Sequence, residues 1–266
     1  MSNSQVSDQL SSFMNSGARL CEDLRRRLRA PEPHDPDYAL FGHFADEGGT
    51  FVDVGANFGL SVASLRLFNR RMAAVSFEPL PWMEPALQLL KEVEGARFEY
   101  HMVALGEHDG TLTMEVPTVD RVPNFFRASG RSGKFANPGS QANLRASLKR
   151  DGPIAVVPVT VPVRRLDGFD LAPTIIKIDV EGLELAVLRG AARTIERHRP
   201  LILLELSANK AEIIETMDQA DYGCFAYAND RLTPANAATK ATNVIFVANE
   251  KVADFRNVNG MQFDLG

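Results

Sequence analysis

The sequence predicts an α/β fold with a mostly parallel, doubly wound sheet and helices on both of its faces. From residue 50 onward, short apolar runs alternate with amphipathic stretches, which is typical of parallel strands joined by helical crossovers. The run Phe51-Val-Asp-Val-Gly-Ala-Asn-Phe-Gly passes at once into glycines, as a buried strand does where it turns sharply into a helix. With 266 residues, 45% of them hydrophobic, the chain is long enough for one large domain with a full core.

The chain before the first strand is predicted to be an extension of that domain. Residues 1 to about 18 are polar and serine-rich, a composition that buries too little apolar surface to hold one conformation alone. Residues 20–28 favour a short helix, and a cluster of three prolines ending at Pro36 stops it. We therefore expect residues 1–39 to be partly disordered or helical, and residues 40–266 to form the domain.

Apolar runs and their breaks place each element of the domain in turn. Asp109-Gly110 is a turn signal, so the run after it is predicted to be an antiparallel strand, and Gly190 is predicted to end a helix. The expected elements are strand 50–54, helix 60–69, strand 73–78, helix 81–94, strand 98–104, strand 111–116, strand 154–163, strand 174–179, helix 181–188, strand 201–205, helix 209–220 and strands 224–228 and 243–248.

Residues 117–152 interrupt this rhythm. They are rich in Pro, Gly, Asn, Ser and Arg without a clear period, and they are too long for a plain connector. We expect a lid, because its glycines give hinge freedom while Phe125, Phe126 and Phe135 can cover an apolar ligand face. Basic residues of the segment, such as Arg127, can hold an acidic group. A disordered surface loop is the alternative for its central part.

Composition narrows the class of partner. A net charge of -5 and a pI of about 5.6 disfavour nucleic-acid binding, which needs a basic surface. No window reaches the roughly 18 apolar residues of a membrane helix, and the N-terminus lacks a signal-peptide pattern. Cys21 and Cys224 lie far apart and are predicted to be free thiols. We expect a cytoplasmic protein that acts on a small molecule and binds no membrane.

Four acidic residues stand at the ends of predicted strands: Asp53, Glu78, Asp179 and Glu205. If these strands are parallel, all four carboxylates meet at one edge of the sheet, where open α/β folds bind their ligands. Glu78 ends the second strand, where a carboxylate can accept hydrogen bonds from both hydroxyls of a ribose. A carboxylate that ends an apolar strand, as Asp179 does, needs a partner or a ligand.

The glycine spacing after the first strand distinguishes between cofactors. A dinucleotide fingerprint has Gly-x-Gly-x-x-Gly, whereas this chain has Asp53-x-Gly55-x-Asn57-x-Gly59, without the glycine that admits a pyrophosphate. A nicotinamide-dependent oxidoreductase is therefore disfavoured. The pattern suits a ligand with one ribose and a zwitterionic amino-acid tail, because the turn offers N–H donors to a carboxylate. S-adenosylmethionine has this shape.

Several motifs together resemble the FkbM family of S-adenosylmethionine-dependent methyltransferases. They are the Phe51–Gly59 stretch, Phe77-Glu-Pro, Val103-Ala-Leu-Gly, Ile176-Lys-Ile-Asp-Val-Glu-Gly-Leu-Glu and Leu188-Arg-Gly-Ala. The resemblance covers roughly residues 40 to 206. It implies a seven-stranded sheet similar to that of class I methyltransferases, which is Rossmann-like, and O-methylation of a sugar or natural-product hydroxyl.

The resemblance also assigns roles to single residues. It implies that Asp53, Gly55, Asn57 and Gly59 cradle the methionine part of the cofactor, that Glu78 binds the ribose, and that Ala104 and Leu105 flank the adenine. Asp179 and Glu181 are the candidate catalytic residues on the acceptor side. They would orient or deprotonate the hydroxyl.

Two alternatives stay open at this stage. Many relatives have histidine where this chain has Leu183, which motivates a second hypothesis: a catalytically silent S-adenosylmethionine-binding partner or regulatory protein. The histidines show no pair at metal-ligand spacing, so no zinc site is predicted. A Mg²⁺ ion on Asp179, Glu181 or Glu205 would be compatible with the carboxylates, although the main hypothesis contains no metal.

Overall fold

The computed structural model describes residues 17–44, 48–206, 209–253 and 262–263. The disorder expected for the first residues concerns 1–16, which lie outside this described part. Residues 17–29 form a helix whose Leu20 and Leu24 are buried in the core. The predicted helix at 20–28 is therefore present, and it packs on the domain.

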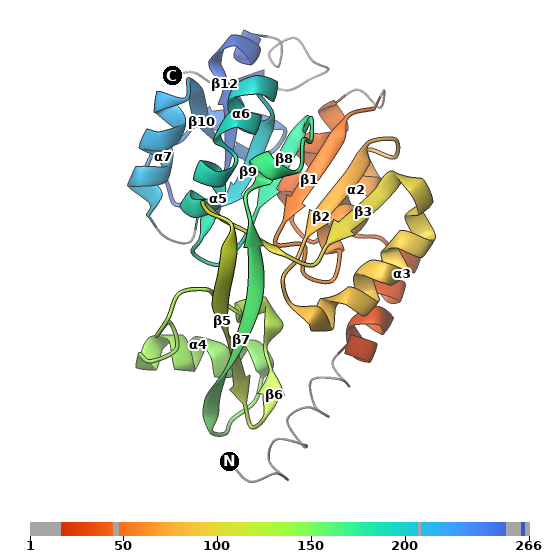
Figure 1. Cartoon of the computed structure of the whole chain (residues 1–266). Helices are drawn as coiled ribbons and strands as arrows, with labels where there is room; N and C mark the ends of the chain where they lie inside the picture. The colour runs from red at the N-terminus through yellow and green to blue at the C-terminus, as the bar shows by residue number, and fades with distance from the viewer. Residues whose placement is uncertain (1–16, 45–47, 207–208, 254–261, 264–266) are drawn as a thin grey trace.

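A sheet with nine strands in the described residues forms the centre of the molecule (Figure 1), in the order β13-β11-β10-β12-β9-β8-β1-β2-β3. Its parallel half contains β3 (Phe98–His101), β2 (Ala73–Phe77), β1 (Thr50–Val54), β8 (Ile175–Ile178) and β9 (Leu201–Glu205). The other half contains β12 (Asn243–Ala248), β10 (Tyr222–Ala228), β11 (Arg231–Pro234) and β13 (Gln262–Phe263). There β12 runs antiparallel to both β9 and β10. The mostly parallel sheet is confirmed, but β11 and β13 extend it beyond the seven strands predicted.

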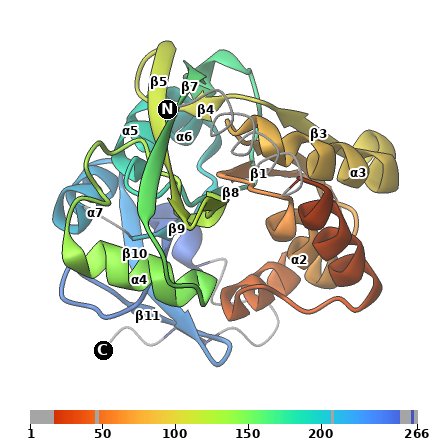
Figure 2. The ribbon, with the colours of Figure 1, turned by 90° about the horizontal axis from the view of Figure 1, so that it is seen from below.

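Helices cover both faces of this sheet, as predicted. One face carries residues 17–29, α2 (Leu60–Phe68) and α3 (Glu84–Glu94), and the other carries α5 (Glu184–Gly190), α6 (Ala192–His198) and α7 (Lys210–Gln219). Figure 2 shows the two groups on opposite sides. Neighbouring residues of β1 serve different faces, because side chains alternate along a strand. Phe51 packs in the first cluster and Val52 in the second.

A second sheet lies below the first in Figure 1, in the order β4-β7-β5-β6. It contains β4 (Ala104–Leu105), β7 (Ile154–Arg164), β5 (Gly110–Val119) and β6 (Val122–Pro123). The single strand predicted at 98–104 is wrong, because β3 ends at His101 and β4 belongs to this second sheet. The N–H of Val103 donates to the carbonyl of His101, and this tight turn redirects the chain.

The segment 117–152 contains more regular structure than its composition suggests. After the end of β5 it holds β6, the 3₁₀ turn η4 (Phe125–Arg127) and α4 (Pro138–Leu148). Asn137 caps α4 by accepting a hydrogen bond from the N–H of Ser140 at 2.8 Å. The 3₁₀ segments elsewhere in the described residues are η1 (Pro36–His43), η2 (Pro81–Met83), η3 (Gly95–Arg97), η5 (Leu166–Gly168) and η6 (Asn249–Lys251).

The helix predicted at 181–188 begins later than expected, at Glu184. Glu181 has φ +54 and Gly182 has φ +109, and an α-helix cannot contain residues in this left-handed conformation. The predicted arrangement of Glu181 and Glu184 on one helical face is therefore wrong. After Ala191 the chain continues as α6, a helix that the sequence pattern did not predict.

Two further sequence predictions concern the whole chain. Cys21 is buried and Cys224 is half-buried, and both are free thiols as predicted. Within the described residues, the structure contains no helix that is both long enough and apolar enough to span a bilayer.

Candidate active site

A cavity of about 340 Å³ lies between the carboxyl ends of the parallel strands and the second sheet. The loops after β1, β2, β8 and β9 form its floor, and β4, β5 and η4 form the facing wall. Its volume is within the range of ligand pockets in proteins. The site therefore lies where ligands bind in open α/β sheets.

The turn after β1 is shaped by contacts inside the protein. Gly55 lines the cavity with φ +81, and a Cβ at this position would overlap the carbonyl of Asp179. Gly55 therefore lets the β1 turn approach the end of β8. Gly59, with φ +92, precedes α2 and lies against Leu90. Gly59 does not line the cavity, so its contribution is to place the start of α2.

Glu78 and Asn57 form a hydrogen-bonded unit on the cavity wall. The Glu78 carboxylate accepts the N–H of Asn57 at 2.8 Å and the N–H of Leu80 at 2.9 Å. Asn57 has φ +50, in the left-handed region that asparagine tolerates better than most residues. Burial raises the pKa of Glu78 to about 7, although the two backbone hydrogen bonds oppose this rise. These hydrogen bonds orient Glu78, the residue predicted to bind the ribose, and its oxygens keep lone pairs for further donors.

Asp53 is fully buried and does not line the cavity. Its Oδ1 lies 3.3 Å from Lys177 Nζ, and its Oδ2 accepts a hydrogen bond from Ser76 at 3.3 Å. Asp53 therefore contacts Lys177, a cavity residue, rather than the cavity itself. Its position does not support the prediction that it binds the methionine part of the cofactor directly.

Lys177 is a cavity residue that the sequence analysis missed. It is buried in β8, and its Nζ donates to the carbonyl of Gly55 at 3.0 Å and lies 3.6 Å from Asp179. Burial alone would lower the pKa of Lys177, but the carboxylates of Asp53 and Asp179 outweigh it and raise the pKa. A lysine within the apolar run 175–178 was the available signal, because buried charges need partners.

Asp179 meets Glu205 at the end of β9. The two carboxyl groups are placed so that they form a hydrogen bond when one of them carries a proton. Burial and the negative charge of Asp179 raise the pKa of Glu205 to about 7. The convergence of these two strand-end acids is confirmed, and Glu205 belongs to the site although only Asp179 and Glu181 were named as catalytic candidates.

Glu181 lines the cavity but is engaged by the segment 117–152. Its carboxylate lies 2.6 Å from Lys134 Nζ and 3.9 Å from the Arg127 guanidinium, and its backbone carbonyl accepts the Ser129 hydroxyl at 2.9 Å. Lys134 and Arg127 were predicted to hold an acidic ligand group. In the structure they face an acid of the protein itself.

The facing wall is mostly apolar. Ala104 and Leu105 line the cavity as predicted, together with Leu112, Met114, Leu183 and the two phenylalanines Phe125 and Phe126. Phe135, which was predicted to cover the ligand, instead packs with Val119 and Leu144 in a small core of its own. This core stabilises α4 on the second sheet.

His34 reaches the cavity from the N-terminal extension, a position that the sequence analysis did not consider. Its Nδ1 lies 2.8 Å from Ser64 Oγ, and its ring packs on Tyr38 with centroids 4.6 Å apart. Burial and the charge of Lys177 lower the pKa of His34, so the imidazole is neutral at pH 7. Within the described residues, no group of three or more His, Cys, Asp or Glu side chains is arranged to hold a metal ion.

Comparisons with known proteins match the chain to methyltransferases. A family model described as the methyltransferase FkbM domain matches residues 53–224. Methyltransferase 1 of Beauveria bassiana (strain ARSEF 2860) is 25% identical over 243 residues, which cover 85% of this chain and 90% of that protein.

Two crystal structures are similar at low identity. Methyltransferase FkbM from Methylobacillus flagellatus KT has a TM-score of 0.48 and 16% identity over 87% of this chain, which spans 59% of that one. A putative caffeoyl-CoA O-methyltransferase from Staphylococcus aureus has a TM-score of 0.42 and 10% identity, with 86% and 91% of the two chains covered. Both TM-scores are low, so the assignment depends on the family model.

The observed sheet, a parallel half followed by an antiparallel β12, agrees with the class I methyltransferase-like fold. The match of the model from the first strand to β10 shows that the chain belongs to the FkbM methyltransferase family.

Proposed function

We propose that this protein is an S-adenosylmethionine-dependent O-methyltransferase of the cytoplasm that acts on a hydroxyl group of a small molecule, such as a sugar or a natural product. The observation that carries the proposal is the placement of two kinds of acid on one cavity. Glu78, held by backbone N–H groups, faces it from one strand end, and the pair of Asp179 and Glu205 faces it from two others.

The residues of the first half fit the cofactor. The Glu78 carboxylate accepts the ribose hydroxyls, because it lines the cavity and each of its oxygens can accept a second hydrogen bond. Ala104 and Leu105 offer an apolar surface to the adenine. Gly55 and Asn57 line the methionine end of the site. Asp53 supports this end indirectly, by compensating the charge of Lys177.

The residues of the second half fit a hydroxyl acceptor. When bound, S-adenosylmethionine supplies a methyl group on a positively charged sulfur. Glu205, when ionised, accepts the proton of the hydroxyl, since a group with a pKa of about 7 is a suitable general base at neutral pH, and the neighbouring Asp179 orients the hydroxyl. Glu181 fixes the segment 117–152 over the acceptor through Lys134.

Calorimetry with S-adenosylhomocysteine and incubation of labelled S-adenosylmethionine with a panel of glycosides and other hydroxyl compounds test the proposal together. We expect cofactor binding, transfer of label to oxygen, and loss of transfer without loss of binding in Asp179→Asn and Glu205→Gln. No heat of binding at millimolar cofactor would refute the cofactor assignment. Binding without transfer to any acceptor would favour the silent binding protein that Leu183 suggested.

The placement of residues 117–152 as a lid is part of the same proposal. Hydrogen exchange measures it: we expect amides of η4 and of the residues around Lys134 to gain protection when S-adenosylhomocysteine and acceptor bind together. Unchanged exchange across this segment would remove it from the mechanism.

A further inference from the structure

Phe126 is an exposed aromatic side chain on the wall of the cavity. Among the described residues, two large hydrophobic side chains are exposed, Val93 at 56% and Phe126 at 54%. Val93 belongs to α3 and does not line the cavity, whereas Phe126 belongs to η4 and does. An exposed apolar side chain inside a pocket is a candidate ligand contact, while a single one on an open surface needs no explanation.

The position of Phe126 is set by its neighbours. Its ring meets the buried ring of Phe58 edge to face, with centroids 5.6 Å apart. The adjacent Phe125 stacks on Trp82 at 5.5 Å and an interplanar angle of 20°. Hydrogen bonds close η4, from the N–H of Arg127 to Asn124 and from that of Ala128 to Phe125. Phe126 therefore presents its ring at a defined place.

The rest of this wall is also apolar. Leu112 and Met114 reach the cavity from β5, and Leu183 reaches it from the residue before α5. Aromatic rings pack favourably both on another ring edge and on a thioether. The surface opposite the acids thus suits a flat, apolar group.

The charges of the cavity disfavour a negatively charged ligand. Four carboxyl groups line it, and two of them, Glu78 and Glu205, have pKa values raised to about 7. The nearby cations already face acids of the protein: Lys177 faces Asp179, and Lys134 and Arg127 face Glu181. A further anion would meet carboxylates without a cation reserved for it.

We propose that the methyl acceptor is an uncharged aromatic compound whose ring packs against Phe126 while its hydroxyl faces Asp179 and Glu205. This inference rests on the proposed O-methyltransferase function and specifies its substrate class. In the transfer, the bond between oxygen and methyl carbon forms as the methyl–sulfur bond breaks. The bonding pair stays on sulfur, and the hydroxyl proton passes to Glu205.

Trp82, the single tryptophan of the chain, offers a readout that does not depend on turnover. It stacks on Phe125, so a ring bound at Phe126 is expected to change its fluorescence. The protein, saturated with S-adenosylhomocysteine, is titrated with three probes of similar size: phenyl glucoside, cyclohexyl glucoside and phenyl glucuronide. We expect phenyl glucoside to bind, and the other two to bind about tenfold more weakly, because one lacks the aromatic ring and the other carries a negative charge.

Variants localise the effect. Phe126→Ala should weaken phenyl glucoside binding about tenfold, with S-adenosylhomocysteine affinity unchanged by calorimetry, whereas Val93→Ala, the matched loss of an exposed apolar side chain, should change neither. The inference is overturned if the glucuronide binds as well as the phenyl glucoside, if Phe126→Ala loses cofactor rather than probe affinity, or if phenyl glucoside fails to bind while the cofactor product binds normally. Failure of cofactor binding itself would instead refute the proposed function.

Discussion

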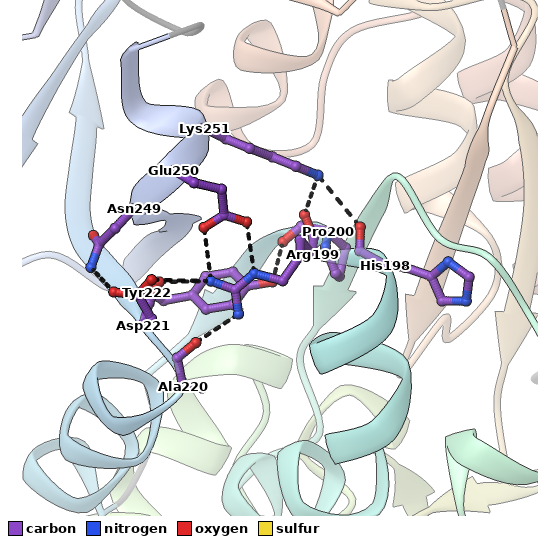
Figure 3. A network of polar contacts seen from close by, with 9 residues as sticks. All are labelled: His198, Arg199, Pro200, Ala220, Asp221, Tyr222, Asn249, Glu250 and Lys251. Carbon is purple, nitrogen blue, oxygen red and sulfur yellow. Dashed lines mark hydrogen bonds and ion pairs between the residues drawn. The ribbon is translucent and has the colours of Figure 1, made fainter.

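Acids in opposite electrostatic situations lie near the two ends of strand β9. At the carboxyl end, Glu205 lies beside Asp179 in the cavity, and its pKa is raised to about 7. Near the amino end, Glu250 faces Arg199 in the network of Figure 3, and hydrogen bonds from Arg199 lower its pKa to about 2. A glutamate can therefore exchange a proton near neutral pH at one end of β9, whereas a glutamate near the other end is charged at neutral pH.

The Arg199 network holds together elements that are distant in sequence. The guanidinium donates to both oxygens of Glu250 at 2.8 and 3.0 Å, to the carbonyl of Ala220 at 2.7 Å, and lies 4.5 Å from the centre of the Tyr222 ring. Lys251 adds a hydrogen bond to the carbonyl of Arg199 at 2.6 Å. Each dashed contact in Figure 3 joins a donor to an acceptor of the protein, as expected for a structural clamp.

The Arg199 network and the cavity thus arrange their charges for different purposes, the first for stability and the second for chemistry. Outside the cavity, Arg199 meets Glu250 in a bidentate geometry, while the cavity brings the acids Asp179 and Glu205 together. Such an arrangement costs stability and is typical of functional sites. The following predictions test this distinction, from the largest expected effect to the smallest.

Lys177→Met should cause the largest loss, because it leaves the Asp53 carboxylate fully buried without its cation. We expect about 3–5 kcal/mol less free energy of unfolding in urea denaturation. The double variant Asp53→Asn with Lys177→Met should recover part of this loss, since no buried charge is left. A single variant as stable as the wild type would mean that Lys177 does not compensate Asp53.

Arg199→Ala should lower the free energy of unfolding by about 2 kcal/mol, since it removes hydrogen bonds to one carboxylate and to backbone carbonyls. Arg199→Lys should recover little, because an ammonium cannot reproduce the bidentate contact. Calorimetry should give wild-type affinity for S-adenosylhomocysteine in both variants. A change in that affinity would show that this network is not separate from the cavity.

Glu78→Gln should weaken cofactor binding by about 1–2 kcal/mol in calorimetry, as expected for losing charged hydrogen bonds to the ribose. The glutamine still offers its oxygen to one of the two N–H groups, of Asn57 or of Leu80, which donate to different oxygens of Glu78. Glu78→Ala would leave both N–H groups unpaired, so we expect it to lower the free energy of unfolding as well. Normal cofactor affinity in Glu78→Gln would refute the ribose assignment.

The smallest effect is a pair of opposite pH dependences. Because its folded pKa is raised from 4.5 to about 7, Glu205 costs stability as the pH rises through that window. In Glu205→Gln, the free energy of unfolding should therefore no longer fall as the pH rises from 4.5 to 7. We expect this fall to be on the order of 1 kcal/mol in the wild type, because the partial exposure of Glu205 reduces the effect. Because its folded pKa is lowered to about 2, Glu250 contributes stability that is lost as the pH falls from 4.5 toward 2, and Glu250→Gln should remove that dependence. Urea denaturation between pH 2 and 7 measures both pH dependences. If the free energy of unfolding varied with pH in the same way in Glu205→Gln and Glu250→Gln, the two acids would not differ as proposed.

Much of the fold follows from local sequence patterns. The strands at 50–54, 201–205 and 243–248 have the bounds that their apolar runs predict, because a short buried run between breaks has few other solutions. The turn at His101–Val103, the late start of α5 and the strands β11 and β13 were missed. They depend on which neighbour offers a hydrogen bond or a contact, and the local pattern carries no information about that neighbour.

By itself, the sequence determined that the first half of the sheet is parallel and that the acids Glu78, Asp179 and Glu205 stand at its edge, since the carboxyl ends of parallel strands lie at the same edge of a sheet. The tertiary structure alone decided the surroundings of each acid. It pairs Lys177 with Asp53 and Lys134 with Glu181, and it places His34 at the cavity. These pairs join residues far apart in the chain, so their distances exist only after folding. Charge, burial and pKa depend on those distances.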